Sequence, residues 1–167
     1  MSERDIIVPS VRVKEKSVFS LDDLYEMLIL WFEHHRYDFQ ERGYKDEDLG
    51  NKKHVSVRWY SEREINDYIK FVIETNFVVL GLEEVEIESG GVKRKSNRGE
   101  IELEIRAYII KDFSNKWETG FMRFLRGFYD KFVIKSSIEG YEKELYEETY
   151  AYTDEIKSFL NLHRFKS

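Results

Sequence analysis

A run of alternating apolar and polar residues between His54 and Phe113 limits what this chain can fold into more than any other feature. Successive side chains on a β-strand point to opposite faces, so a strand with one buried face alternates in this way. The alternation occupies residues 55–60, 69–79, 84–88 and 101–109, with short connections and no helical pattern between them. Parallel crossovers are thereby excluded. The sequence predicts about four antiparallel strands with one dry and one wet face.

The end of the last hairpin can be placed in two ways. Ser96-Asn97-Arg98-Gly99 has favourable hairpin chemistry, because Asn and Gly tolerate positive φ angles. We favour a turn at this segment, which sets Lys95 near Glu100 and places Gly90-Gly91 in a bulge of the third strand. The alternative makes Ser89-Gly90-Gly91 a tight turn and divides the region into two short hairpins. A further turn is expected at Gly81.

The stretch before the sheet predicts a strand and then a helix. Residues 6–16 alternate, and Pro9 within them is typical of an edge strand. Ser20 followed by Asp23 is a helix-capping pattern, and Gly43 is the expected end of the helix. We expect Tyr44 to Lys53 to form a polar loop.

This first helix is too broadly apolar to be covered by one sheet. Leu24, Leu28 and Phe32 recur at helical spacing and form one stripe. Four further apolar residues widen the arc: Met27, Ile29, Leu30 and Trp31. We therefore predict that Met27, Leu30 and Trp31 form a partner surface or a contact between copies of the chain.

Two more helices are expected after the sheet, one from Ser114 or Asn115 and one after Gly140. The apolar residues of the first of them are expected to be buried; they are Trp117, Phe121, Phe124, Leu125, Phe128 and Phe132. Phe124 and Phe128 are expected to join one core cluster with the sheet residues Phe71, Ile73, Leu103 and Ile105. The last helix has one apolar face that includes Leu145, Tyr152 and Ile156.

The element order is β-α-β-β-β-β-α-α, which predicts a single α+β domain over residues 1–167. It would hold a four- to five-stranded antiparallel meander sheet with the three helices packed mainly on one face. This order resembles that of helix-grip folds, in which a curved antiparallel sheet wraps a long helix.

Composition and motifs exclude several classes of function. The formal net charge of −6 argues against wholesale wrapping of nucleic acid, and no apolar run is long enough for a membrane span. A cytoplasmic location is the default expectation, and abundant Lys and Glu with no Cys fit a thermophile or an AT-rich coding sequence.

Neither His34-His35 nor Asp46-Glu47-Asp48 has the spacing of a metal site, and no nucleotide-binding or nucleophile motif occurs. We expect no cofactor, and the balance favours a protein that is not an enzyme.

Three hypotheses for function remain. The leading one is a binding or scaffold domain that contacts another protein or a second copy of itself. The second is a ligand-binding or enzymatic cavity between sheet and helices, lined by Trp59, Phe71, Tyr108 and Phe124. The third is weak association with nucleic acid or ribosomes through four basic residues, Lys93, Arg94, Lys95 and Arg98. For these four residues a solvated hairpin end is favoured over an anion contact.

Overall fold

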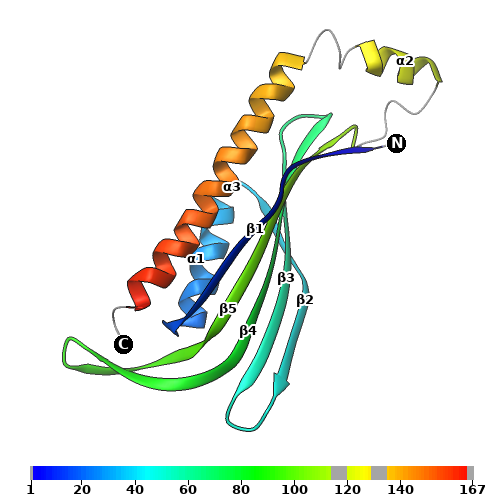
Figure 1. Cartoon of the computed structure of the whole chain (residues 1–167). Helices are drawn as coiled ribbons and strands as arrows, with labels where there is room; N and C mark the ends of the chain where they lie inside the picture. Colours follow the sequence, from blue (N-terminus) through cyan, green and yellow to red (C-terminus); the bar gives the residue numbers. More distant parts are fainter. Residues whose placement is uncertain (1, 114–119, 129–134, 165–167) are drawn as a thin grey trace.

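The computed structural model describes residues 2–113, 120–128 and 135–164, and it has an α+β fold built on one antiparallel sheet (Figure 1). The strands are β1 (Glu3–Phe19), β2 (Asp38–Asp48), β3 (Lys53–Glu64), β4 (Ile69–Ser89) and β5 (Val92–Lys111). Their order across the sheet is β1-β5-β4-β3-β2. The helices are α1 (Leu21–His34), α2 (Gly120–Phe128) and α3 (Lys135–Arg164). The predicted class and element order are confirmed.

The five strands are not divided along the chain as the sequence predicted. The segment expected to be a polar loop, Tyr44 to Lys53, contains the second half of the edge strand β2, Tyr44 to Asp48, which is exposed on both faces and so shows no alternation. The first half of β2 lies where the first helix was expected to continue to Gly43. Gly81 does not end a strand. It lies inside β4 with a φ of 61°, where the pairing with β5 shifts register between Leu80 and Glu83. The two predicted strands on either side of Gly81 are therefore one long bulged strand.

The preferred placement of the last turn was wrong. Ser89 pairs with Val92, and Gly90 and Gly91 form the turn with φ angles of 60° and 78°. Such angles are accessible to Gly at little cost. The region is one long hairpin rather than two short ones, and Ser96 to Gly99 lie within β5.

Helix α1 begins as predicted and ends early. The Ser20 hydroxyl accepts a hydrogen bond from the Asp23 amide, and Leu24, Leu28 and Phe32 are fully buried. The helix ends at His34, and Gly43 lies in β2. The early end follows from Arg36, whose φ of 63° cannot continue a right-handed helix. Helix α3 starts at Lys135, so Gly140 is inside it rather than before it.

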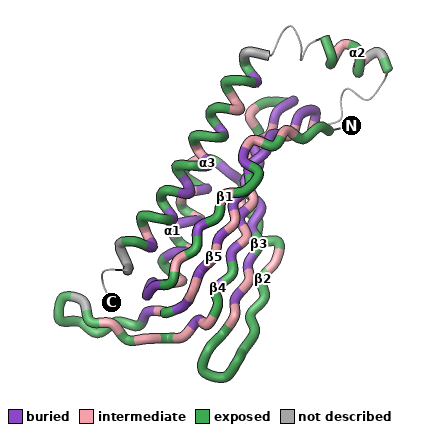
Figure 2. Tube along the Cα trace, in the orientation of Figure 1, coloured by how far each residue is buried: buried purple, intermediate pink, exposed green. Residues whose placement is uncertain are grey.

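Helices α1 and α3 cover one face of the curved sheet, and the core lies between them and that face (Figures 1 and 2). Trp59 is at its centre, with ring centroids 5.0 Å from Tyr25, 4.8 Å from Phe39 and 5.2 Å from Phe77. The predicted core residues Phe71, Ile73, Leu103 and Ile105 are fully buried there. No helix that the structure describes is long and apolar enough to cross a membrane.

Helix α2 does not join this core. It stands beyond the end of the sheet, away from α1 and α3 (Figure 1). Phe124 is 71% exposed and Phe128 is 54% exposed, so their predicted burial was wrong. Leu125 is half-buried. The other residues predicted for this face lie outside those whose side chains the structure describes.

Candidate functional site

The candidate site is a groove between α1 and α3 on the side of the helices away from the sheet core. It offers about 850 Å³ of space. Its apolar lining comes from Met27, Leu30 and Trp31 of α1 and from Ala151 of α3. The remaining lining residues are Glu33, His34, His35 and Glu155. The groove is thus an apolar strip with a carboxylate from each helix beside it.

The three residues predicted as a partner surface all line this groove. Leu30 is 53% exposed, whereas Met27 and Trp31 are half-buried and also pack on the core. The structure therefore brings the predicted residues together. Sequence reasoning did not identify the second wall, Ala151 and Glu155, because a small residue on an acidic helix face carries no apolar signal.

Trp31 is held rigidly at the floor of the groove. Its ring is stacked on His35 with centroids 3.9 Å apart, and it lies 4.8 Å from the ring of Tyr152 in α3. His35 Nδ1 lies 2.8 Å from the Trp31 carbonyl oxygen, one helical turn back. The indole therefore presents a fixed apolar surface, which lowers the entropy lost on contact with a partner.

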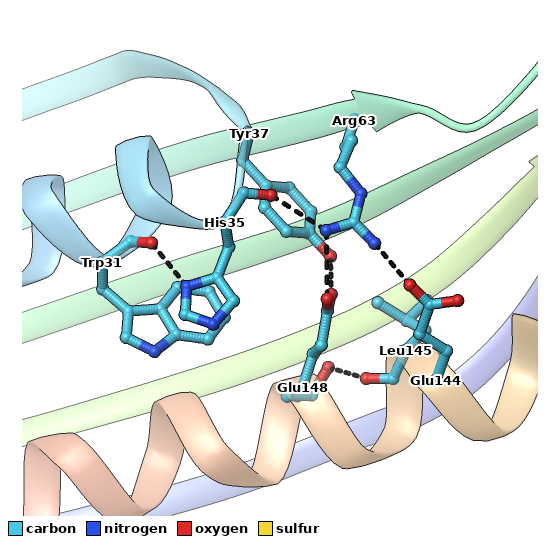
Figure 3. A network of polar contacts seen from close by, with 8 residues as sticks. Trp31, His35, Tyr37, Arg63, Glu144, Leu145 and Glu148 are labelled. Carbon is cyan, nitrogen blue, oxygen red and sulfur yellow. Dashed lines mark hydrogen bonds and ion pairs between the residues drawn. The ribbon is translucent and has the colours of Figure 1, made fainter.

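A polar network at the end of α1 fixes the spacing of the two groove walls (Figure 3). Arg63 of β3 donates through Nη1 to the His35 carbonyl at 2.9 Å and to Glu148 Oε1 at 3.0 Å. Its Nη2 donates to Glu144 at 2.9 Å, and Tyr37 donates its hydroxyl to Glu148 Oε2 at 2.7 Å. One side chain thus ties β3 to both helices. The partners of the network lie within the chain, which indicates a structural role.

Two buried tyrosines, Tyr37 in the network and Tyr152 in the core, stay neutral. Burial first, and then the charge and hydrogen bond of Glu148, raise the pKa of Tyr37 well above its ordinary value. Burial likewise raises the pKa of Tyr152, whose hydroxyl lies 2.9 Å from Thr75 Oγ1 in the core. Neither hydroxyl is poised to lose a proton near neutral pH, so neither is suited to act as a base.

The four residues proposed to line a cavity do not meet. Trp59 and Phe71 are in the core between sheet and helices, where neighbouring side chains surround them. Tyr108 is on the opposite face of the sheet with Tyr60 and Val72. Phe124 is exposed on α2. The prediction of one cavity lined by these residues was wrong, because Tyr108 alternates to the other face and α2 is not packed on the sheet.

Side chains from the edge strands cover Tyr60 and Tyr108 on the wet face, whereas Val78 and Leu80 on this face are exposed. Arg4 of β1 lies over the Tyr108 ring at 4.2 Å, and Arg42 of β2 lies over the Tyr60 ring at 3.5 Å. Tyr108 also donates to Glu74 at 2.8 Å. Burial, with Glu62 as hydrogen-bond acceptor, raises the pKa of Tyr60 to about 12. Coverage by the edge strands therefore accounts for the two tyrosines without a partner.

The basic residues of the β4–β5 hairpin face an acidic strand. Lys95 is 3.1 Å from Glu84, and Arg98 is 3.6 Å from Glu83. Lys93 pairs in register with Glu88. These contacts offset the positive charge and favour the solvated-end interpretation over an anion contact. Figure 1 places this hairpin at the opposite end of the sheet from α2, so the basic residues do not converge with Arg123.

The site has no metal-binding group among the described residues, and comparison with known proteins assigns it no function. Among the residues that the structure describes, no group of three His, Asp or Glu side chains could hold a metal ion. No family model matches this chain, and no curated protein matches it. Function is therefore inferred from the surface chemistry of the molecule.

Proposed function

We propose that this protein is a binding domain without catalytic activity, and that it associates with a second copy of itself through the α1–α3 groove. The observation that carries the proposal is the groove itself, with exposed Leu30 beside the half-buried Met27 and Trp31. Contiguous apolar surface rimmed by polar groups is typical of protein interaction sites.

Two further features support a binding role over a ligand cavity. The core between helices and sheet is filled by close ring contacts around Trp59. Arg63 and Glu144 line an open hollow of about 600 Å³, but the Arg63 guanidinium is already hydrogen-bonded to Glu144 and Glu148 within the chain. A site that binds a small molecule would instead leave such groups available to the ligand.

The proposal is tested by sedimentation velocity over a wide range of protein concentrations. We expect reversible self-association in the wild type and a loss of more than about tenfold in the association constant for Leu30→Glu, because a buried unpaired carboxylate is costly. Leu49→Glu is the matched control, since Leu49 is 49% exposed at the end of β2, outside the residues that line the groove. A wild type that remains monomeric at all concentrations, or equal weakening by both substitutions, would overturn the proposal.

A further inference from the structure

Helix α2 and the α1–α3 groove are two incompletely covered apolar surfaces on one chain. Phe124 is the most exposed of the large apolar residues that the structure describes, and Leu125 and Phe128 lie on the same side of α2. At 100° per residue these three fall within an arc of roughly 100°, and Arg123 lies about 100° from Phe124, on the flank of that arc. A short amphipathic helix of this kind fits a hydrophobic groove on a partner.

The charges of the two surfaces are complementary. Helix α2 contains two arginines and no acidic residue, although the whole chain has a net charge of −6. The groove has Glu33 on one wall and Glu155 on the other. A helix lying with Phe124 on the apolar strip would hold Arg123 near the carboxylates at the rim. Opposite charges at the rim of an interface favour one orientation and raise the rate of association.

The connection between α2 and α3 is short for docking within the same chain. Phe128 and Lys135 are separated by residues 129–134, which span at most about 24 Å when fully extended. Ala151 lies about 24 Å along α3 from Lys135, at 1.5 Å per residue. With Phe124 beside Ala151 and α2 antiparallel to α3, Phe128 would lie about 6 Å nearer Lys135, so docking in the same chain would still stretch most of the connection. A second copy has no such restriction.

We infer that α2 of one copy binds in the α1–α3 groove of a second copy, and that the exchange is reciprocal. The inference rests on the proposed self-association and specifies which surfaces meet. In Figure 1, α2 lies past the N-terminal end of α3. The α3 residues that line the groove, Ala151 and Glu155, are near the middle of that helix. Consider a two-fold axis that is perpendicular to α3 and lies midway between α2 and the groove. It places each α2 in the groove of the other copy, because the distance along α3 from α2 to the groove is the same in both copies. The product is a closed dimer rather than an open chain of copies.

Disulfide trapping tests which surfaces meet, and the chain suits it because it contains no cysteine. One protein variant carries Leu30→Cys. A second variant carries Phe124→Cys and a mass tag, so that the mixed dimer differs in mass from both homodimers. The two variants are mixed and oxidised. We expect the mixed disulfide dimer to exceed each homodimer by at least fivefold, since a disulfide needs Cα atoms within about 7 Å. Val92→Cys in place of Phe124→Cys is the matched control, because Val92 is 55% exposed at the opposite end of the sheet.

The outcomes separate this inference from the proposed function. A dominant Leu30→Cys homodimer would support self-association through α1 and would overturn the exchange of α2. Sedimentation gives the second readout: Phe124→Glu should lower the association constant at least tenfold and Val92→Glu should not. The charge-reversed Arg123→Glu should also weaken association, and adding Glu155→Arg should restore it.

A lipid surface is the alternative occupant for α2. A wild type that is monomeric and co-sediments with phosphatidylserine-containing vesicles, while Phe124→Glu abolishes this co-sedimentation, would overturn the inference and assign α2 to a lipid surface.

Discussion

Arg63 Nη1 lies 3.0 Å from Glu148 Oε1, and this ion pair between β3 and α3 is largely shielded from water, with the two side chains 16% and 18% exposed. The same nitrogen also donates to the carbonyl of His35 at the end of α1. The pair therefore sets the spacing between the helices that form the groove. Its loss should affect both the stability of the fold and the shape of the groove.

Replacing Arg63 with Met should destabilise the protein by about 2–4 kcal/mol. The substitution leaves Glu148 partly buried without its cation, which is the costly way to break such a pair. Lys95→Met is the control, because the Lys95–Glu84 pair is exposed and surface pairs contribute about 0–1 kcal/mol. Urea unfolding measures both. Equal effects for the two variants would show that the Arg63 network does not hold α3 in place.

Truncating Phe124 to Ala should change the stability of the monomer by less than about 1 kcal/mol, because the side chain is 71% exposed. Phe71→Ala should cost about 3–5 kcal/mol, because Phe71 is fully buried in the core. Both are measured by urea unfolding at low protein concentration, where association contributes little. A large loss for Phe124→Ala under these conditions would mean that α2 packs within its own chain.

The contrast between Phe71 and Phe124 shows how far the sequence alone could predict this structure. Period-two alternation identified the dry face of the sheet correctly, including Phe71, because a strand in this position has one side to bury. Helical periodicity in α2 showed only that an apolar stripe exists. It contains no information about what covers the stripe, so assigning Phe124 to the same core was an assumption about tertiary contacts.

Turn positions and edge strands were the other source of error. The segment Ser96 to Gly99 has good turn chemistry but lies within β5, because the chain already turns at Gly90 and Gly91, which adopt positive φ angles. In the edge strand β2 the only residue that packs on the core is Phe39, so there is no alternation to detect. The α1 residues that line the groove, Met27, Leu30 and Trp31, were predicted as a partner surface, since the apolar arc of this helix exceeds what one sheet can cover. The α3 wall depends on how two distant helices pack, which local sequence patterns do not report.

The buried tyrosines should make the protein unstable at high pH. The pKa of Tyr152 is raised in the folded state from the value of 10.0 expected in the unfolded chain. A group with a raised folded pKa stabilises the fold fully below pH 10, and this stability is lost as pH rises further. Above pH 10, each such tyrosine lowers the free energy of unfolding by about 1.4 kcal/mol for each further pH unit. Tyr37 adds to it in the same direction.

Tyr152→Phe isolates this effect. At pH 8 it should cost about 1 kcal/mol, because Thr75 loses its hydrogen-bond partner in the core. Between pH 10 and 11 the variant should lose less stability than the wild type, by up to about 1.4 kcal/mol. Urea unfolding at each pH gives the comparison. Parallel stability curves for the two proteins would show that Tyr152 is not held neutral by its site.

The basic residues of the β4–β5 hairpin should not bind nucleic acid in the wild type, because glutamates of β4 offset their charge. Lys95 contacts Glu84, and Arg98 contacts Glu83. Replacing the four glutamates at positions 83, 84, 86 and 88 with Gln removes this compensation. That variant should bind single-stranded RNA weakly at low salt and lose the binding as salt rises, as expected for contacts to phosphates. Fluorescence anisotropy with a labelled homopolymer measures both proteins. Salt-sensitive binding by the wild type that disappears when Lys93, Arg94, Lys95 and Arg98 are changed to Glu would instead assign an anion-binding role to this hairpin.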